Sequence, residues 1–292
     1  KLPKQYVIGW SIKPIQPLLG FALTIAFTSS VWVLFTQLDK FVLSGILPLA
    51  DYGYFTLAVL VAGGILQLSA PIGSPVMPRM ARLEAEQQYE QMRQVYLNAT
   101  QFIAVIVVTA GIVLAGVAKP VLYAWTGDIN LANQAAPILR LYALGNALLA
   151  LSAFPYYLQY AKGNLKYHLI GNIISVVILI PAVVWAATHY GAVGAGWVWF
   201  LMQLIYLVFW VSYIHAKLEP NMNLIWFKTF IPSVVTVSVF VLLTTQWVEY
   251  SGSRSVILLK IITISLCSVF IAMLSSVRIL NIFKAKIYRR AI

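Results

Sequence analysis

Long apolar runs separated by short polar segments dominate the sequence. A helix that crosses a bilayer needs about 17–25 mostly apolar residues. Eight runs meet that length, at 18–38, 53–74, 99–122, 137–160, 168–189, 193–214, 227–247 and 256–277. The period-two alternation of transmembrane strands is not seen in them. The pattern therefore predicts an all-α, polytopic membrane protein with about eight transmembrane helices.

Composition supports this fold class. Of the 292 residues, 61% are hydrophobic and 10% are charged, whereas soluble domains have about 45–50% apolar and about 25% charged residues. A soluble globular enzyme and a disordered segment are thereby excluded. The single cysteine, Cys267, lies in an apolar run, so a disulfide framework and a cysteine metal site are excluded too.

The net charge of +12 suggests nucleic-acid binding until its distribution is considered. Fifteen of the 20 lysines and arginines lie in the first 17 residues, in the connections 75–98, 161–167 and 215–228, and in the C-terminal tail. The alternate connections hold only Lys40, Lys119 and Arg254. By the positive-inside rule both termini are then cytoplasmic, which suits an even number of spans. The charge is explained without nucleic acid, which we do not expect as a partner.

The sequence offers little enzymatic chemistry. Its three histidines, His168, His189 and His215, lie at different span ends without metal-ligand spacing. Motifs for phosphate loops, serine hydrolases and zinc proteases are missing. The glycines at 191–196 superficially resemble a nucleotide fingerprint, but they follow a membrane helix in the wrong order. They instead predict close approach of the fifth and sixth spans. We expect no catalytic residue, metal or cofactor.

Ionisable residues at membrane depth are the candidate functional groups, because their burial in lipid is costly. Asp39 and Lys40 end the first span near its outer side, and Arg140 and Lys260 lie about one turn into the fourth and eighth spans from that side. A structural alternative is that both lysines extend to the headgroups and Asp39 caps a turn. Arg140 fits that alternative less well, which favours a role facing a cavity.

The first span also carries a polar line. Ser29, Thr36 and Lys40 fall within about 40° on a helical wheel, and Gln37 flanks them. Serine and threonine can bond their own helix backbone, so the line is consistent with packing. A stripe that ends in charges is equally what a water-filled cavity needs. Deeper neutral groups each favour an interhelical hydrogen bond over a ligand contact; they are Gln67, Asn146, Gln159, Asn172 and Gln203.

Two segments resemble a known family. Residues 37–58 read QLDKFVLSGILPLADYGYFTLA, and residues 71–80 read PIGSPVMPRM. They are similar to Wzx-type bacterial polysaccharide flippases, which belong to the superfamily of multidrug, oligosaccharidyl-lipid and polysaccharide exporters. Members carry an aspartate and a Tyr-Gly-Tyr-Tyr-like pattern at a helix hairpin, followed by a proline-bounded inner turn. Residues 163–166 and 190–196 also resemble the fifth and sixth helices of a lobe in that family.

The resemblance implies a fold of two six-helix lobes around a central cleft, with two extra C-terminal helices. Residues 1–215 would match the C-terminal lobe and residues 216–292 the extra pair, so we expect the first lobe to be missing from this sequence. The implied function is to flip a polyprenyl-pyrophosphate-linked oligosaccharide across the bacterial inner membrane, in O-antigen, capsule or exopolysaccharide biosynthesis. Implied partners are membrane lipids, a coupling proton or sodium ion, and other polysaccharide-assembly membrane proteins.

In this scheme Lys40, Arg140 and Lys260 supply positive charge to the pyrophosphate. Asp39 pairs with Arg140 or binds the coupling cation. The side chains expected along the sugar path are Ser29, Thr36 and Gln37. Alternatives are a cation-coupled drug exporter of the same superfamily, a membrane polysaccharide polymerase or glycosyltransferase, and a structural scaffold. Short outer connections and the lack of clustered carboxylates count against the enzymes.

Overall fold

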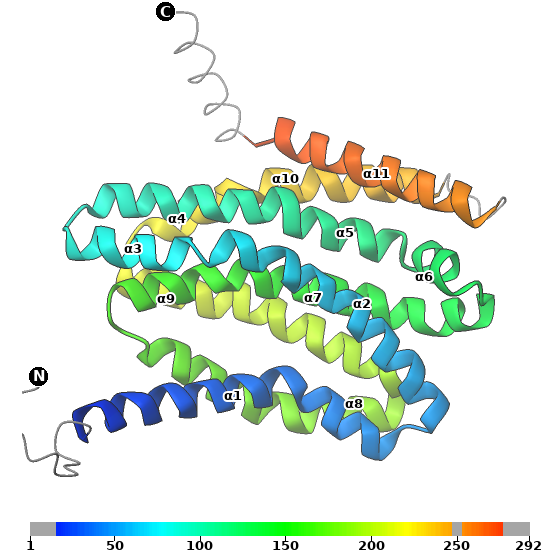
Figure 1. Cartoon of the computed structure of the whole chain (residues 1–292), viewed down its shortest axis with the longest axis horizontal. Helices are drawn as coiled ribbons and strands as arrows, with labels where there is room; N and C mark the ends of the chain where they lie inside the picture. The colour runs from blue at the N-terminus through cyan, green and yellow to red at the C-terminus, as the bar shows by residue number, and fades with distance from the viewer. Residues whose placement is uncertain (1–15, 247–252, 277–292) are drawn as a thin grey trace, which may run out of the picture.

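The computed structural model describes residues 16–246 and 253–276, which are helical apart from short connections (Figure 1). The elements are α1 (Gln16–Ile46), α2 (Leu49–Gly73), α3 (Val76–Ala85), α4 (Tyr89–Ile103), η1 (Ala104–Val108), α5 (Thr109–Gly116), α6 (Ala118–Thr126), α7 (Ile129–Ala161), α8 (Lys166–Ile205), η2 (Tyr206–Trp210), α9 (Val211–Leu218), α10 (Met222–Thr245) and α11 (Arg254–Leu274). The predicted all-α class is confirmed.

Each predicted span overlaps a helix, although several helices run well past the apolar runs. The third predicted span, 99–122, runs past the end of α5 at Gly116 into α6, and the predicted ends at 247 and 277 lie outside the described residues. Within the described residues, six continuous helices are long and apolar enough to cross a membrane. The longest, Lys166–Leu218, contains two predicted spans, 168–189 and 193–214. The first predicted span lies within α1. The chain is therefore a multi-pass membrane protein.

Gly191 divides α8 into the fifth and sixth spans. Its φ of 61° and ψ of −150° interrupt the helix. In a straight helix residues eight apart are about 12 Å from each other. Here a Cβ placed on Gly194 would collide with the carbonyl oxygen of Ala186, so the chain folds back on itself. The predicted close approach of these two spans at their glycines is confirmed.

The helix α7 lies at the centre of the bundle. It packs against α2, α8, α5 and α6. The pair α10 and α11 lies beside α4 and α5, across the molecule from α1 (Figure 1). A division of the chain at residue 215, between a six-helix lobe and this pair, remains a prediction.

The basic connections gather at one end of the molecule, where α3 turns into α4 and where α7 and α9 end (Figure 1). Lys162 links the three connections, since its Nζ lies 2.7 Å from Glu219 Oε1 and 3.8 Å from Glu84 Oε1. At the opposite end Arg254 donates hydrogen bonds of 2.9 and 2.6 Å to the carbonyl oxygens of Ala124 and Trp125. Those bonds attach the start of α11 to the last turn of α6 and satisfy its terminal carbonyls.

Buried hydrogen bonds hold α10 against the main bundle. The Trp226 indole donates to Thr100 Oγ1 at 3.0 Å, and Gln101 Nε2 donates to the carbonyl oxygen of Thr229 at 2.9 Å. Nearby, the Tyr96 hydroxyl and His215 Nε2 lie 2.7 Å apart. His215, expected at a span end, is thus a fully buried packing residue.

Candidate functional site

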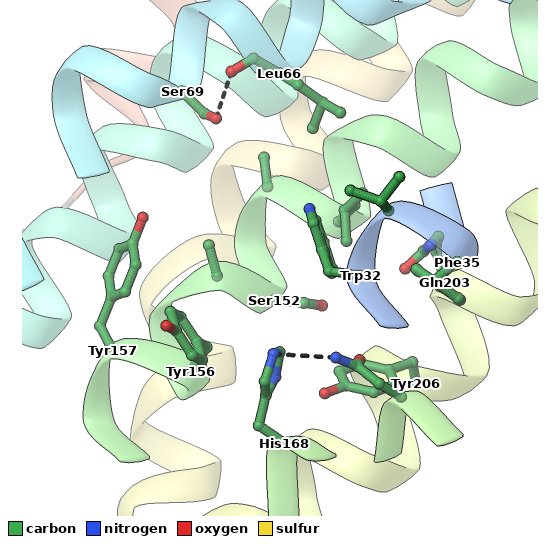
Figure 2. Close-up of a pocket in the computed structure, with 15 residues that line it drawn as sticks. Trp32, Phe35, Leu66, Ser69, Ser152, Tyr156, Tyr157, His168, Gln203 and Tyr206 are labelled. Carbon is green, nitrogen blue, oxygen red and sulfur yellow. Dashed lines mark hydrogen bonds between the residues drawn. The ribbon is translucent and has the colours of Figure 1, made fainter. Parts of the chain in front are cut away.

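A cavity of about 550 Å³ lies among α1, α2, α7, α8 and η2 (Figure 2). Aromatic rings and neutral polar groups dominate its wall, and none of its described lining residues is charged. The lining residues are Trp32, Val33, Phe35, Leu66, Ser69, Leu149, Ala150, Ser152, Ala153, Tyr156, Tyr157, His168, Asn172, Gln203 and Tyr206. A pocket of this size lies within the range of about 300–1,000 Å³ that is usual for small-ligand sites.

Helical periodicity places these side chains on the same wall. Leu149, Ser152 and Tyr156 are spaced three and four residues apart on α7, so they share a face of that helix. His168 and Asn172 have the same i,i+4 relation on α8. The reversal of the chain at Gly191 then brings the second half of α8 back along the bundle, with Gln203 on the cavity.

Hydrogen bonds and ring contacts fix His168 within the cavity. Its Nε2 lies 3.1 Å from Asn172 Nδ2, and its backbone N–H donates to Gln159 Oε1 at 2.7 Å. The centroid of its ring is 4.5 Å from that of Tyr156. Figure 2 shows His168 and Tyr156 side by side, with Trp32 and Tyr206 beyond them.

Two buried polar atoms of residues that line this cavity have no hydrogen-bond partner among the described residues. They are His168 Nδ1 and Gln203 Nε2, and the Gln203 side chain is only 1% exposed. An unsatisfied buried donor or acceptor costs about 1–3 kcal/mol. Both atoms are also buried from the open space of the cavity, so a ligand in the cavity does not reach them in this arrangement of the side chains.

The interhelical hydrogen bonds predicted for the neutral polar residues form at some positions and not at others. Asn146 makes the expected interhelical bond, donating to the carbonyl oxygen of Ala62 at 2.9 Å. Gln159 joins α7 to α8 through its bond to His168, and Gln67 is exposed. The expectation was wrong for Asn172, whose bond to His168 stays within α8, and for Gln203, whose amide nitrogen is unpaired.

The structure brings together three of the predicted site residues on α1. Lys40 Nζ donates to Gln37 Oε1 at 2.6 Å, and Gln37 Nε2 lies 3.5 Å from Thr36 Oγ1. Thr36 in turn donates to the carbonyl oxygen of Trp32 at 3.1 Å. This polar chain runs beside the cavity, although none of its three side chains lines it. The side chain of Ser29 lies outside the described residues.

Asp39 is buried and bound to a tyrosine. It is 4% exposed, and its Oδ2 accepts a hydrogen bond of 2.6 Å from the Tyr142 hydroxyl. Because α1 continues to Ile46, Asp39 lies about two turns inside the helix and does not cap a turn. Among the described residues, no salt bridge links Asp39 to Arg140.

The other two predicted cations lie away from α1. Arg140 is exposed and lines a separate cavity of about 420 Å³ between α5, α7 and α10. Since α7 begins at Ile129, Arg140 lies about 16 Å along the helix, not one turn from its end. Lys260 is on α11, across the molecule from α1 (Figure 1). The predicted residues therefore occupy three places and do not form one cluster.

Sequence reasoning missed the aromatic members of the larger cavity. Trp32, Tyr156 and Tyr206 resemble ordinary core or interfacial rings, and His168 stands out in the sequence only as a histidine at a span end. The i,i+4 pairing of His168 with Asn172 was the available signal, because two polar side chains then share one face of an apolar helix.

Comparison with known proteins identifies one family model and one solved structure that are similar to this chain. Residues 1–129 match the sequence model of a family described as polysaccharide biosynthesis protein. This match, over less than half of the chain, agrees with the predicted resemblance to polysaccharide flippases. The fold is similar to a solved structure, "Lipid II flippase MurJ, inward closed conformation", with a TM-score of 0.66 and 14% sequence identity. That match covers 92% of this chain but 56% of the MurJ chain, so this chain spans little more than half the MurJ length. No curated protein matches the chain.

Proposed function

We propose that this chain is part of a transporter that flips a polyprenyl-pyrophosphate-linked oligosaccharide across the bacterial inner membrane. The oligosaccharide that it moves across the membrane would be used for O-antigen, capsule or exopolysaccharide assembly. The family match over residues 1–129 and the MurJ-like fold support this proposal. The observation that carries it is the cavity among α1, α2, α7 and α8, because polar side chains kept inside a membrane bundle mark substrate pathways.

The physical task is to move sugars and a doubly charged pyrophosphate through a low-dielectric layer. A route for them needs hydrogen-bonding groups and positive charge. The proposed route has neutral groups at the cavity and a cation at Lys40, with Asp39 as a site for a coupling proton or sodium ion. Arg140 would contribute charge at the separate cavity between α5, α7 and α10, and Lys260 would do so on α11. Transport would proceed by rocking one lobe against the other. Membrane lipids and other polysaccharide-assembly membrane proteins are the proposed partners.

Arg140 provides the first test. In the full-length protein we expect Arg140→Ala to lower polysaccharide export about tenfold at unchanged protein level, because a bond to a charged group is worth about 1.5–3 kcal/mol. Arg140→Lys should retain part of the activity, since the charge remains. Arg82→Ala is the control, because Arg82 is an exposed residue of α3 whose partner is Glu86. Normal export by Arg140→Ala would remove this residue from the mechanism.

A cation-coupled drug exporter is the second candidate. The specific observation in its favour is the mixture of aromatic and aliphatic side chains in the wall of the larger cavity, since apolar and aromatic linings are typical of sites for drug-sized molecules. A drug-susceptibility panel in a deletion strain distinguishes the two functions. Increased sensitivity with intact surface polysaccharide would favour the exporter, and lost polysaccharide with unchanged sensitivity would favour the flippase.

A further inference from the structure

A groove of about 530 Å³ lies between the end of α2, α3 and α4, and it shares no lining residue with the larger cavity. It is at the end of the bundle where the basic connections gather (Figure 1). Its wall combines one arginine, one glutamate and three side-chain amides with apolar residues. We infer that it binds phosphatidylethanolamine, a zwitterionic phospholipid, from the leaflet on that side of the membrane.

The groove crosses the membrane boundary that the apolar runs predict. Ile72 lies near the end of the predicted span 53–74, and Phe102 lies near the start of the predicted span 99–122. Arg79 and Glu90 lie outside both runs. One end of the groove is therefore at the depth of acyl chains and the other at the depth of headgroups, as a bound phospholipid requires.

The face of α4 and η1 on this groove changes from polar to apolar in the same direction. Side chains three or four residues apart share a face of a helix. Gln91, Gln94 and Asn98 come first along this face. Phe102 and Ile106 follow, and they are 44% and 38% exposed. The amides suit the ester oxygens of a phospholipid, and the two apolar side chains suit its acyl chain.

Arg79 is the cation available to the phosphate. It is exposed, and it makes no hydrogen bond or ion pair within the part of the chain that the structure describes. The neighbouring Arg82 differs, since its Nε lies 3.4 Å from Glu86 Oε1. A guanidinium binds phosphate oxygens through two parallel N–H groups, so Arg79 fits this part of a headgroup.

Glu90 distinguishes between phospholipid headgroups. Its Oε1 accepts from Gln94 Nε2 at 3.1 Å, whereas its Oε2 is 3.9 Å from Arg93 Nη1, which is too long for a hydrogen bond. The primary ammonium of ethanolamine has three N–H donors for this carboxylate. The quaternary nitrogen of choline has none, and a phosphatidylglycerol headgroup brings only negative charge. Phosphatidylethanolamine alone among these three satisfies both Arg79 and Glu90.

Native mass spectrometry of the purified, delipidated full-length protein tests the headgroup. Added phosphatidylethanolamine should bind about fivefold more tightly than phosphatidylcholine with the same acyl chains, the size expected for one partly exposed charge pair. Phosphatidylglycerol should also bind more weakly. Glu90→Gln should remove the preference for ethanolamine over choline. Glu86→Gln is the matched control, because Glu86 is an exposed glutamate that pairs with Arg82 and does not line the groove.

Photochemical cross-linking tests the location. Phosphatidylethanolamine with a diazirine in its acyl chain should cross-link to residues 99–106 in peptide maps. Arg79→Gln should lower the yield about fivefold, and Arg82→Gln, outside the groove, should leave it unchanged. Both arginines are exposed, so Tm in lipid-free detergent should match the parent protein for both variants. A lower yield at unchanged Tm then reports lost binding and not lost folding.

Three results would overturn the inference. They are equal affinities for phosphatidylethanolamine and phosphatidylcholine in the parent protein, cross-links that persist in Arg79→Gln, and tighter binding of a polyprenyl phosphate than of phosphatidylethanolamine. The last result would assign the groove to the transport substrate. The inference does not rest on the proposed function, because the groove is separate from the larger cavity.

Discussion

Tyr142 joins α7 to three other helices through a row of buried contacts. Its hydroxyl bonds to Asp39 on α1, and its ring stacks on Trp199 of α8 at 6.0 Å between centroids. The Trp199 indole donates to Asn146 Oδ1 at 3.1 Å, and Asn146 donates to the Ala62 carbonyl oxygen on α2. These groups are mutually satisfied, so they set the relative positions of four helices that also line the larger cavity.

Removing the tyrosine hydroxyl should destabilise the protein. Tyr142→Phe leaves Asp39 Oδ2 without its donor, although Oδ1 keeps the Lys40 backbone N–H; the cost is about 1.5–3 kcal/mol if the carboxyl is ionised. Thermal unfolding in detergent should show a lower Tm. Asp39→Asn keeps an acceptor for the hydroxyl and should lower Tm less. Tyr54→Phe is the control, because Tyr54 is half-buried on α2. An unchanged Tm for Tyr142→Phe would show that this bond contributes nothing to stability.

The sequence locates Asp39 as a charge at membrane depth but not its partner. Tyr142 lies 103 positions away, and a tyrosine in an apolar run gives no sign that its hydroxyl is needed. The charged pair Asp39-Lys40 was also interpreted as the end of the first span. The helix instead continues to Ile46, and within it Tyr142 bonds to Asp39 and Gln37 bonds to Lys40.

At the scale of helices, hydrophobic runs predict where a helix is but not where it ends. The predicted fourth span begins at 137, whereas α7 begins at Ile129. The Asp128 side chain caps this start, accepting from the backbone N–H groups of Asn130 and Leu131 at 2.8 and 3.1 Å. A search for apolar runs overlooks such polar first turns. Because α7 begins eight residues before the predicted span, Arg140 lies farther from the start of its helix than predicted.

Gly191 offers a test of the helix reversal. Its backbone, at φ 61° and ψ −150°, occupies a region that is essentially restricted to glycine. Gly191→Ala should therefore lower the free energy of unfolding by about 1–3 kcal/mol. The cost comes from the backbone alone, since an added Cβ meets no atom within 4 Å.

Gly45→Ala is a matched control for that measurement. A Cβ at Gly45 also meets nothing within 4 Å, but Gly45 lies in α1 without a positive φ. Alanine is the better helix former there, so this variant should be neutral or slightly stabilising. Equal Tm values for the two variants would contradict the strain assigned to Gly191.

At the scale of the whole molecule, the distribution of basic residues and the contacts between connections both distinguish two opposite ends of the bundle. The basic connections lie together, with Lys162 bridging Glu84 and Glu219, and the Arg254 contact lies at the other end. The number of spans and the clustering of cations were both available from composition and periodicity. The cavity was not, because it forms only when the chain reversal at Gly191 brings Gln203 alongside residues of α1, α2 and α7.

The positive-inside bias predicts that the end with Lys162 faces the cytoplasm. We place single cysteines at Gln88, in the exposed turn between α3 and α4, and at Asn130, in the exposed first turn of α7, with Cys267→Ser as background. A maleimide that cannot cross the inner membrane should label Asn130→Cys in intact cells. It should label Gln88→Cys only after permeabilisation. The two positions do not alter the charge bias, since both are neutral, so the label reports the native orientation. The reverse pattern would invert the topology, and it would move the Lys40 end of α1 from the outer to the cytoplasmic side of the transport route.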